Sequence, residues 1–188
     1  MPLAYLLGTF PSAVIVARSK GIDITTVGSH NPGASNVGRV LGTAWGVLVF
    51  ALDGLKGAIP ASLGLLIDEP KGTYALIAAV VLGHMFPVTR RFKGGKGVAT
   101  IGGAIVVLHP VVFAILTAIW VLIRTTTSKA SLGSIVIAIG LPLGVALSGS
   151  PGWEVAASGG LAALVVLRHL DNIRRLLGGS ELSASRPG

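Results

Sequence analysis

Seven apolar runs divide the chain, and short stretches rich in charged residues, glycine and proline separate them. The runs cover residues 2–17, 42–67, 74–88, 97–108, 110–123, 132–147 and 153–167. A helix needs about 20 apolar residues to cross a hydrocarbon core about 30 Å thick, and several runs are shorter than that. The pattern therefore predicts an all-α integral membrane protein, a bundle of about seven short transmembrane helices.

The division at Pro110 has two interpretations. The segment 97–123 is either one long helix kinked by this proline or a tight hairpin that turns there. The charges favour the hairpin, because the basic loops 18–39, 90–96, 124–129 and 168–186 then all lie on one side.

Under the hairpin topology, all but two of the 15 Lys and Arg residues belong to that one face. The exceptions are Lys56, within a run, and Lys71, in an opposite loop. The positive-inside rule makes the basic face cytoplasmic, with the N-terminus outside and the C-terminus inside. The sequence thus predicts a multi-pass membrane protein whose basic loops are cytoplasmic.

Composition supports a membrane protein of one domain. Of 188 residues, 52% are hydrophobic and 12% are charged, about half the charged fraction of a soluble domain. The 27 glycines lie mostly within apolar runs, where small residues allow close helix packing. No loop is long enough for a second domain, so residues 1–188 are expected to form one, with 182–188 as a flexible tail.

Charge and cysteine content narrow the classes of function. In a soluble protein, the net charge of +8 would suggest nucleic acid as a partner. Here the basic residues lie in loops next to the membrane, so we expect contact with membrane lipids and not with nucleic acid. The chain has no cysteine, which excludes disulfides, thiolate metal sites and a cysteine nucleophile. The first run lacks a basic segment before it, so we expect a first span and not a cleaved signal peptide.

The strongest local motif is FKGGKGVAT at 92–100. Gly94, Gly95 and Gly97 would let backbone amides approach an anion, and Lys93 and Lys96 add charge just before a helix begins. The spacing is not that of a P-loop. The alternative is a basic loop that touches anionic lipid headgroups.

A second polar motif, GSHNPGASNVGR, covers 28–39. Ser35 or Asn36 would cap the following helix in the simpler interpretation. In the other, Arg39 holds a phosphate or carboxylate through its planar fork. Both remain open from these residues alone.

Asp53 and Lys56 lie three residues apart within an apolar run and so share one helix face. Charges inside a membrane are candidates for function, and a structural ion pair is the equal alternative.

The last motif is RHLDNIRRL at 168–176. His169 and Asn172, at i and i+3, would face one site on a continuing helix, whereas an amphipathic cytoplasmic tail explains the arginines alone. Ser131 and Ser134 share a helix face at the start of the sixth run, and His84 precedes the motif at 92–100. Acidic residues are too few and scattered for a metal site, so no metal and no cofactor are expected.

Together these segments resemble one family, the bacterial membrane glycerol-3-phosphate acyltransferases that use acyl phosphate as donor. The resemblance rests on the motifs at 28–39, 83–100, 131–134 and 168–181, with Asp53 and Lys56 between them. They follow the family's order over nearly the whole chain. One departure is Ser35 where the family has threonine, which keeps the hydroxyl.

The resemblance implies transfer of a fatty acyl group from acyl phosphate to the sn-1 hydroxyl of glycerol 3-phosphate, at a cytoplasmic site. The residues expected to carry catalysis are Ser29, Arg39, Lys96, His169 and Asn172. Those expected to bind substrate or phosphate are Asn31, Gly33, Asn36, Asp53, Lys56, Lys93, Gly94, Gly95, Gly97, Ser131 and Ser134. A transporter of anionic solutes, a metal-dependent lipid phosphotransferase and a noncatalytic scaffold that binds anionic lipid are the rival classes.

Overall fold

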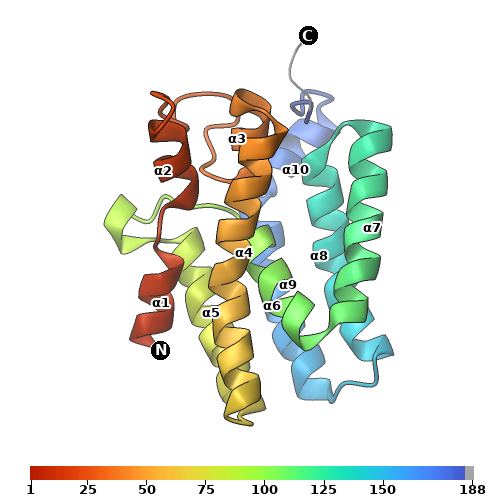
Figure 1. Cartoon of the computed structure of the whole chain (residues 1–188). Coiled ribbons are helices and arrows are strands. Elements are labelled where there is room, and N and C mark those ends of the chain that lie inside the picture. The colour runs from red at the N-terminus through yellow and green to blue at the C-terminus, as the bar shows by residue number, and fades with distance from the viewer. Residues whose placement is uncertain (185–188) are drawn as a thin grey trace. The chain divides into compact units, whose positions relative to one another are not determined.

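The apolar runs fold into α-helices in the computed structural model, which describes residues 1–184. Over these residues it contains ten α-helices, one 3-10 helix and no strand (Figure 1). The all-α prediction is therefore confirmed. The described chain divides into two compact units, Met1–Ala104 and Ile105–Ala184.

The first unit carries the N-terminal motifs. Its elements are α1 (Pro2–Gly8), α2 (Ser12–Arg18), α3 (Ala34–Leu41), α4 (Thr43–Leu66), α5 (Pro70–Met85), the 3-10 helix η1 (Val88–Arg90) and the start of α6 (Val98–Leu108). Residues 105–108, the last turn of α6, belong to the second unit.

The first apolar run is not one continuous helix, contrary to the prediction for 2–17. It breaks between α1 and α2 at Thr9–Pro11, because Pro11 has no amide hydrogen to continue the helix and disfavours a helical conformation at Phe10. Two half-helices result, and backbone carbonyls are exposed at the break for other partners.

Glycines bring the helices of this unit close together. A Cβ on Gly8 would overlap the backbone of α5, and one on Gly83 would overlap Tyr5 of α1. At the contact of α4 with α6, a Cβ on Gly57 would overlap the carbonyl of Thr100. These glycines serve as the packing devices that their place in apolar runs predicted.

The lengths of α4 and α5 determine where along α4 the loop after α5 begins. The two helices pack side by side and are joined by the short segment 67–69. Since α4 has 24 residues and α5 has 16, the end of α5 lies about 12 Å short of the N-terminal end of α4, at 1.5 Å per residue. The glycine loop 91–97 therefore starts level with the middle of α4, where Asp53 and Lys56 lie.

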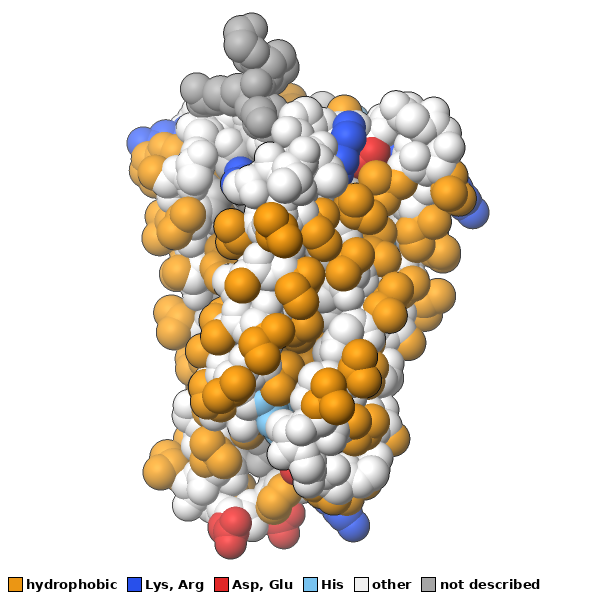
Figure 2. All heavy atoms as spheres, turned by 90° about the vertical axis from the view of Figure 1, so that its right-hand side faces the viewer, with side chains coloured by type: hydrophobic (Ala, Val, Ile, Leu, Met, Phe, Trp, Pro, Cys, Tyr) orange, Lys and Arg blue, Asp and Glu red, His pale blue; other side chains and the backbone are white. Residues whose placement is uncertain are grey.

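The second unit contains α7 (Pro110–Thr127), α8 (Ala130–Leu147), α9 (Gly152–Arg168) and α10 (Leu170–Leu177). His109 leaves the helical conformation (φ −138°, ψ 66°), so 97–123 forms two helices and not one. The side of the molecule turned toward the viewer in Figure 2 is largely hydrophobic along its length, as a surface in contact with lipid would be.

Within residues 1–184, four helices are long and apolar enough to cross a membrane, at Thr43–Leu66, Pro70–Arg90, Pro110–Thr127 and Ala130–Leu147. Pro2–Arg18 and Val98–Leu108 are apolar but shorter. The prediction of apolar membrane helices is confirmed for the four long helices, whose bounds lie within about four residues of the predicted runs 42–67, 74–88, 110–123 and 132–147. Of the predicted tail 182–188, Ala184 donates to the carbonyl of Ser128 at 2.7 Å, and 185–188 lie outside the described residues.

Candidate active site

The glycine loop is held against the end of α5 by backbone hydrogen bonds. The amide of Gly95 donates to the carbonyl of His84 at 3.1 Å, and that of Gly94 donates to Met85 at 3.2 Å. A Cβ on Gly95 would overlap the imidazole of His84. Both glycines are thus required for close approach to α5.

This arrangement corrects one expectation. The amides of Gly94 and Gly95 were expected to line an anion cradle, but each already donates to a carbonyl of α5. Lys96, Gly97 with its positive φ of 80° and the first turn of α6, whose amides lack acceptors within the helix, follow these two glycines in the chain. Lys93 is exposed beside them.

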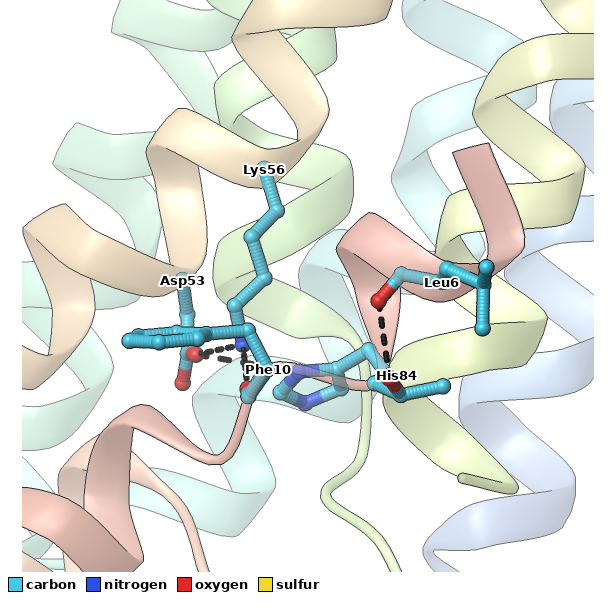
Figure 3. A network of polar contacts seen from close by, with 6 residues as sticks. Leu6, Phe10, Asp53, Lys56 and His84 are labelled. Carbon is cyan, nitrogen blue, oxygen red and sulfur yellow. Dashed lines mark hydrogen bonds and ion pairs between the residues drawn. The ribbon is translucent and has the colours of Figure 1, made fainter. Parts of the chain in front are cut away.

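Asp53 and Lys56 form a buried ion pair on α4. Nζ of Lys56 donates to Oδ1 of Asp53 at 2.7 Å and to the carbonyl of Phe10, at the α1–α2 break, at 2.6 Å. Their side chains are 3% and 4% exposed. Nδ1 of His84 lies 3.7 Å from the same Asp53 oxygen (Figure 3). Of the two interpretations, this geometry favours the structural ion pair over direct contact of Lys56 with substrate.

A small pocket adjoins this ion pair within the first unit. Its polar lining includes Ser12, Lys56, His84 and Arg90 as well as Gly95 of the loop. The Ser12 hydroxyl is buried and has no hydrogen-bond partner among the described residues. The pocket therefore offers polar groups next to the glycine loop.

The second motif is organised by Asn36, which is 1% exposed. Its side-chain amide donates to the carbonyls of Ile24 at 3.2 Å and Val27 at 3.0 Å. Its oxygen accepts from the amide of Ser29 at 2.8 Å and from Nη1 of Arg39 at 3.1 Å. Both donors and both lone pairs of the amide are thus used, so Asn36 orders the loop and positions its neighbours.

Neither Ser35 nor Asn36 caps the second membrane helix, which corrects the simpler interpretation of this motif. Both lie inside the separate helix α3, which begins after Gly33 and ends before Gly42. Gly42 has a φ of 105° and turns the chain into α4. Within this unit the structure brings Ser29 and Arg39 to the same asparagine, while Asn31 lies in the loop beside Gly33.

In the second unit, the motif residues converge on Glu181. Its Oε1 accepts from Asn172 at 2.6 Å and from Ser131 at 2.7 Å, and its Oε2 accepts from Nε of Arg175 at 2.8 Å. Lys129 donates to its backbone carbonyl. The segment after α10 is thereby fastened across the start of α8.

The same contacts decide the ionisation of Glu181. Burial alone would raise the pKa of this carboxyl, but the hydrogen bonds from Ser131, Asn172 and Arg175 together with the arginine charge outweigh it, so the pKa lies below its ordinary value of 4.5. Glu181 is therefore an anion near neutral pH.

His169 lies at the junction of α9 and α10, and not on a continuing helix as expected. Its Nδ1 lies 2.8 Å from the carbonyl of Val165, which can only accept, so Nδ1 carries the proton. In the neutral ring, Nε2 is then an acceptor. Ser134 accepts from the indole of Trp120 at 3.2 Å and donates to the carbonyl of Ala130 at 3.0 Å.

Three groups of these networks were absent from the predicted site residues. They are the Phe10 carbonyl, Glu181, and the Tyr5 hydroxyl, which donates to the carbonyl of Phe86 at 2.7 Å and accepts from the amide of Val88 at 3.1 Å. Glu181 stands in the motif that carried the family resemblance, whereas no sequence pattern marks Phe10 or Tyr5. Among the described residues no group of three His, Asp or Glu side chains is placed to hold a metal ion.

Known proteins resemble the chain over nearly its whole length. The family model for glycerol-3-phosphate acyltransferase matches residues 1–179. The glycerol-3-phosphate acyltransferase of Aquifex aeolicus is 42% identical over 95% of this chain and 94% of its own. That of Geotalea daltonii is 41% identical over 95% of this chain and 92% of its own.

Two crystal structures of PlsY (YgiH), an integral membrane glycerol 3-phosphate acyltransferase, have a similar fold. The glycerol 3-phosphate form has a TM-score of 0.90 and 41% identity over 96% of this chain and 92% of that one. The lysophosphatidic acid form has a TM-score of 0.87 and 40% identity, over 96% and 91%. The resemblance inferred from the motifs is confirmed, and this chain belongs to the glycerol-3-phosphate acyltransferase family of integral membrane proteins.

Proposed function

We propose that this protein transfers a fatty acyl group from acyl phosphate to the sn-1 hydroxyl of glycerol 3-phosphate. The products are 1-acylglycerol 3-phosphate, or lysophosphatidic acid, and inorganic phosphate, and the reaction begins phospholipid synthesis. The observation that carries the proposal is the match of the family model to 179 residues, which spans every motif up to α10.

The chemistry of the chain suits an acyl phosphate donor. Such a donor is a mixed anhydride, so its carbonyl is already activated. The chain has no cysteine for a thioester intermediate, and its motifs are rich in lysine, arginine and backbone amides, which bind phosphate. We assign phosphate binding to Lys96, Arg39 and Lys93 with the Gly97 turn, and orientation of the substrates to Ser29, Ser134, His169 and Asn172.

The transfer needs no covalent intermediate on the protein. The sn-1 oxygen attacks the acyl carbonyl carbon, and the bond from that carbon to the phosphate oxygen breaks with its electron pair leaving on phosphate. The hydroxyl proton ends on a phosphate oxygen of the substrates. Lysine and arginine then stabilise charge on the phosphates, and fixed positions of the two substrates supply most of the acceleration.

His169 is assigned to orientation in this scheme and not to proton abstraction. The contact of Nδ1 with the Val165 carbonyl fixes the orientation of the ring at the junction of α9 and α10, which suits a residue that positions substrate. A His169→Ala enzyme that keeps most of its turnover at saturating substrate agrees with this assignment.

We also propose seven membrane spans with the N-terminus outside and the motifs at the cytoplasmic face of the bacterial inner membrane, and both units acting as one acyltransferase domain. The excess of Lys and Arg in the motif loops supports this topology. Because the chain has no cysteine, single cysteines at Asp68 and Thr89 test it. A membrane-impermeant maleimide should label only the Asp68 position in intact cells, and labelling of Thr89 alone would reverse the topology.

The donor assay tests the activity directly. Purified protein in detergent is given glycerol 3-phosphate with acyl phosphate, acyl-CoA or acyl carrier protein of matched chain lengths, and lysophosphatidic acid is measured. We expect product from acyl phosphate alone. Product from a thioester donor alone would overturn the donor assignment, and no product from any donor with folded protein would overturn the function.

A further inference from the structure

The ion pair in the middle of α4 has no assigned task in acyl transfer. Lys56 uses two of its three N–H donors on Asp53 and on the Phe10 carbonyl, and its side chain is 4% exposed. Its charge is also balanced by Asp53 at 2.7 Å. A lysine held in this way contributes little to the attraction of a phosphate dianion.

The pair instead connects three parts of the first unit. Lys56 reaches the break between α1 and α2, and Asp53 faces His84 at 3.7 Å near the end of α5 (Figure 3). His84 in turn supports the glycine loop, since its carbonyl accepts from Gly95 and its ring occupies the space where a Gly95 Cβ would lie. The chain of contacts thus runs from Phe10 through α4 to Gly95.

We propose that Asp53, Lys56 and His84 form a tether that positions the glycine loop for phosphate. These are positioning residues, acting through Gly95 on Lys96 and Gly97. The expected effect of the tether on substrate binding rests on the proposed function. Its effect on the position of the glycine loop rests on the contacts alone.

The broken α1–α2 segment gives the tether its anchor. The Tyr5 hydroxyl of α1 bridges Phe86 and Val88, which follow α5, while the Phe10 carbonyl at the break accepts from Lys56. The residues that lead into the loop are therefore fastened to the N-terminal helices at two points. Removal of the ion pair should release one of these points and leave the other.

The test distinguishes a change in the position of the glycine loop from a loss of protein stability. In the double variant Asp53→Leu/Lys56→Met, apolar side chains of similar size replace the pair, a change that in other proteins is often neutral or stabilising. We expect a Tm within about 3 °C of the unmodified protein. The KM for glycerol 3-phosphate should rise about tenfold, which corresponds to a modest loss of binding, while kcat changes less than about threefold.

A spin label reports the loop without any need for activity. The chain has no cysteine, so Thr89→Cys, exposed in η1, and Leu66→Cys, 81% exposed at the far end of α4, each take one nitroxide. In the double variant the label at Thr89 should become more mobile, and the label at Leu66 should not change. Gly64→Ala, which would press on Thr73 at the same far end, controls for destabilisation and should leave both the KM and the Thr89 label unchanged.

The outcomes distinguish the tether from the proposed function. An unchanged KM and an unchanged Thr89 spectrum in the folded double variant overturn the tether, whatever the donor assay gives. If the unmodified protein makes no lysophosphatidic acid, the function fails and the label alone decides the tether. Should the double variant not fold, Asp53→Asn, which keeps the shape and removes only the charge, carries the same two measurements with an expected KM rise of about threefold.

Discussion

The side-chain amide of Asn172 donates a 2.6 Å hydrogen bond to Glu181, the same carboxylate oxygen that accepts from Ser131. One buried acid therefore fixes residues from α8 and α10, although 50 positions separate Ser131 from Glu181. We assign Asn172 to substrate orientation, so Glu181, which lies after α10, fixes the position of a residue of the proposed site.

Glu181→Gln should destabilise the protein by about 1–3 kcal/mol, because a neutral amide weakens three hydrogen bonds and turns a donor toward Arg175. The measurement is the thermal unfolding midpoint in detergent, alongside kcat/KM. Asp171→Asn is the matched control, since the Asp171–Arg174 pair is exposed and should contribute little. Equal midpoints for the two variants would contradict the role of Glu181.

The contribution of Glu181 should depend on pH. Its pKa is lower in the folded protein than its ordinary value of 4.5, so folding favours the ionised form. The stabilisation is fully present above pH 4.5 and is lost as pH falls through the folded pKa. The difference in midpoint between the unmodified protein and Glu181→Gln should be constant from pH 8 to pH 5 and shrink below 4.5; a difference that grows in acid would contradict this sign.

Gly95→Ala should impair the enzyme, because the added methyl overlaps the ring of His84 and forces the loop away from α5. Overpacking of this kind costs about 1–3 kcal/mol. Gly160→Ala in α9 is the control, as nothing lies within 4 Å of the position that its methyl group would take. If the overlap is the cause, Gly95→Ala/His84→Ala should lose less than the sum of the two single losses.

Lys96→Ala should lower kcat/KM about 10- to 150-fold, the loss expected when a charged hydrogen bond to phosphate is removed. Its unfolding midpoint should stay close to that of the unmodified protein. Lys71→Ala, in the first turn of α5, removes an exposed lysine outside the motifs and should leave kcat/KM unchanged. Equal effects of the two substitutions would favour a basic loop that only touches lipid headgroups.

The long membrane helices were predictable from sequence, since α4, α7 and α8 lie in long, mostly apolar runs. The break in the first run has a local signal in Pro11, but the apolar residues around it conceal the break. The hydrogen bond from Lys56 to the Phe10 carbonyl at this break was not predictable, because the two residues are 46 positions apart and the acceptor is a backbone group.

In the candidate site, the sequence motifs predicted which residues take part but not the role of each one. The motifs predicted Asn36, Gly94 and Gly95 as binding residues, and the structure places Asn36 against the backbone of its own motif and the two glycines against the end of α5. Their roles differ from those expected, because hydrogen bonds to carbonyls of Ile24, His84 and Met85 already use their donors. A spacing pattern reports which residues a site needs, whereas the satisfaction of each donor depends on the folded backbone.

Asn36 provides the sharpest test of positioning by a residue whose own hydrogen bonds are all used. Asn36→Leu removes the donors to the carbonyls of Ile24 and Val27 and also the acceptor for Ser29 and Arg39. Leaving two backbone carbonyls unpaired should cost about 2–4 kcal/mol of folding free energy.

Asn36→Asp is the matched partner of that variant, because it loses the two donors but keeps the acceptor for Arg39. Both variants should unfold at lower temperature. At a temperature where both are folded, the KM for glycerol 3-phosphate should rise about tenfold in Asn36→Leu and less in Asn36→Asp, since only the first releases Arg39. An equal KM in both variants would mean that Arg39 does not depend on Asn36 for its position, and would leave this asparagine with a purely structural role in the loop.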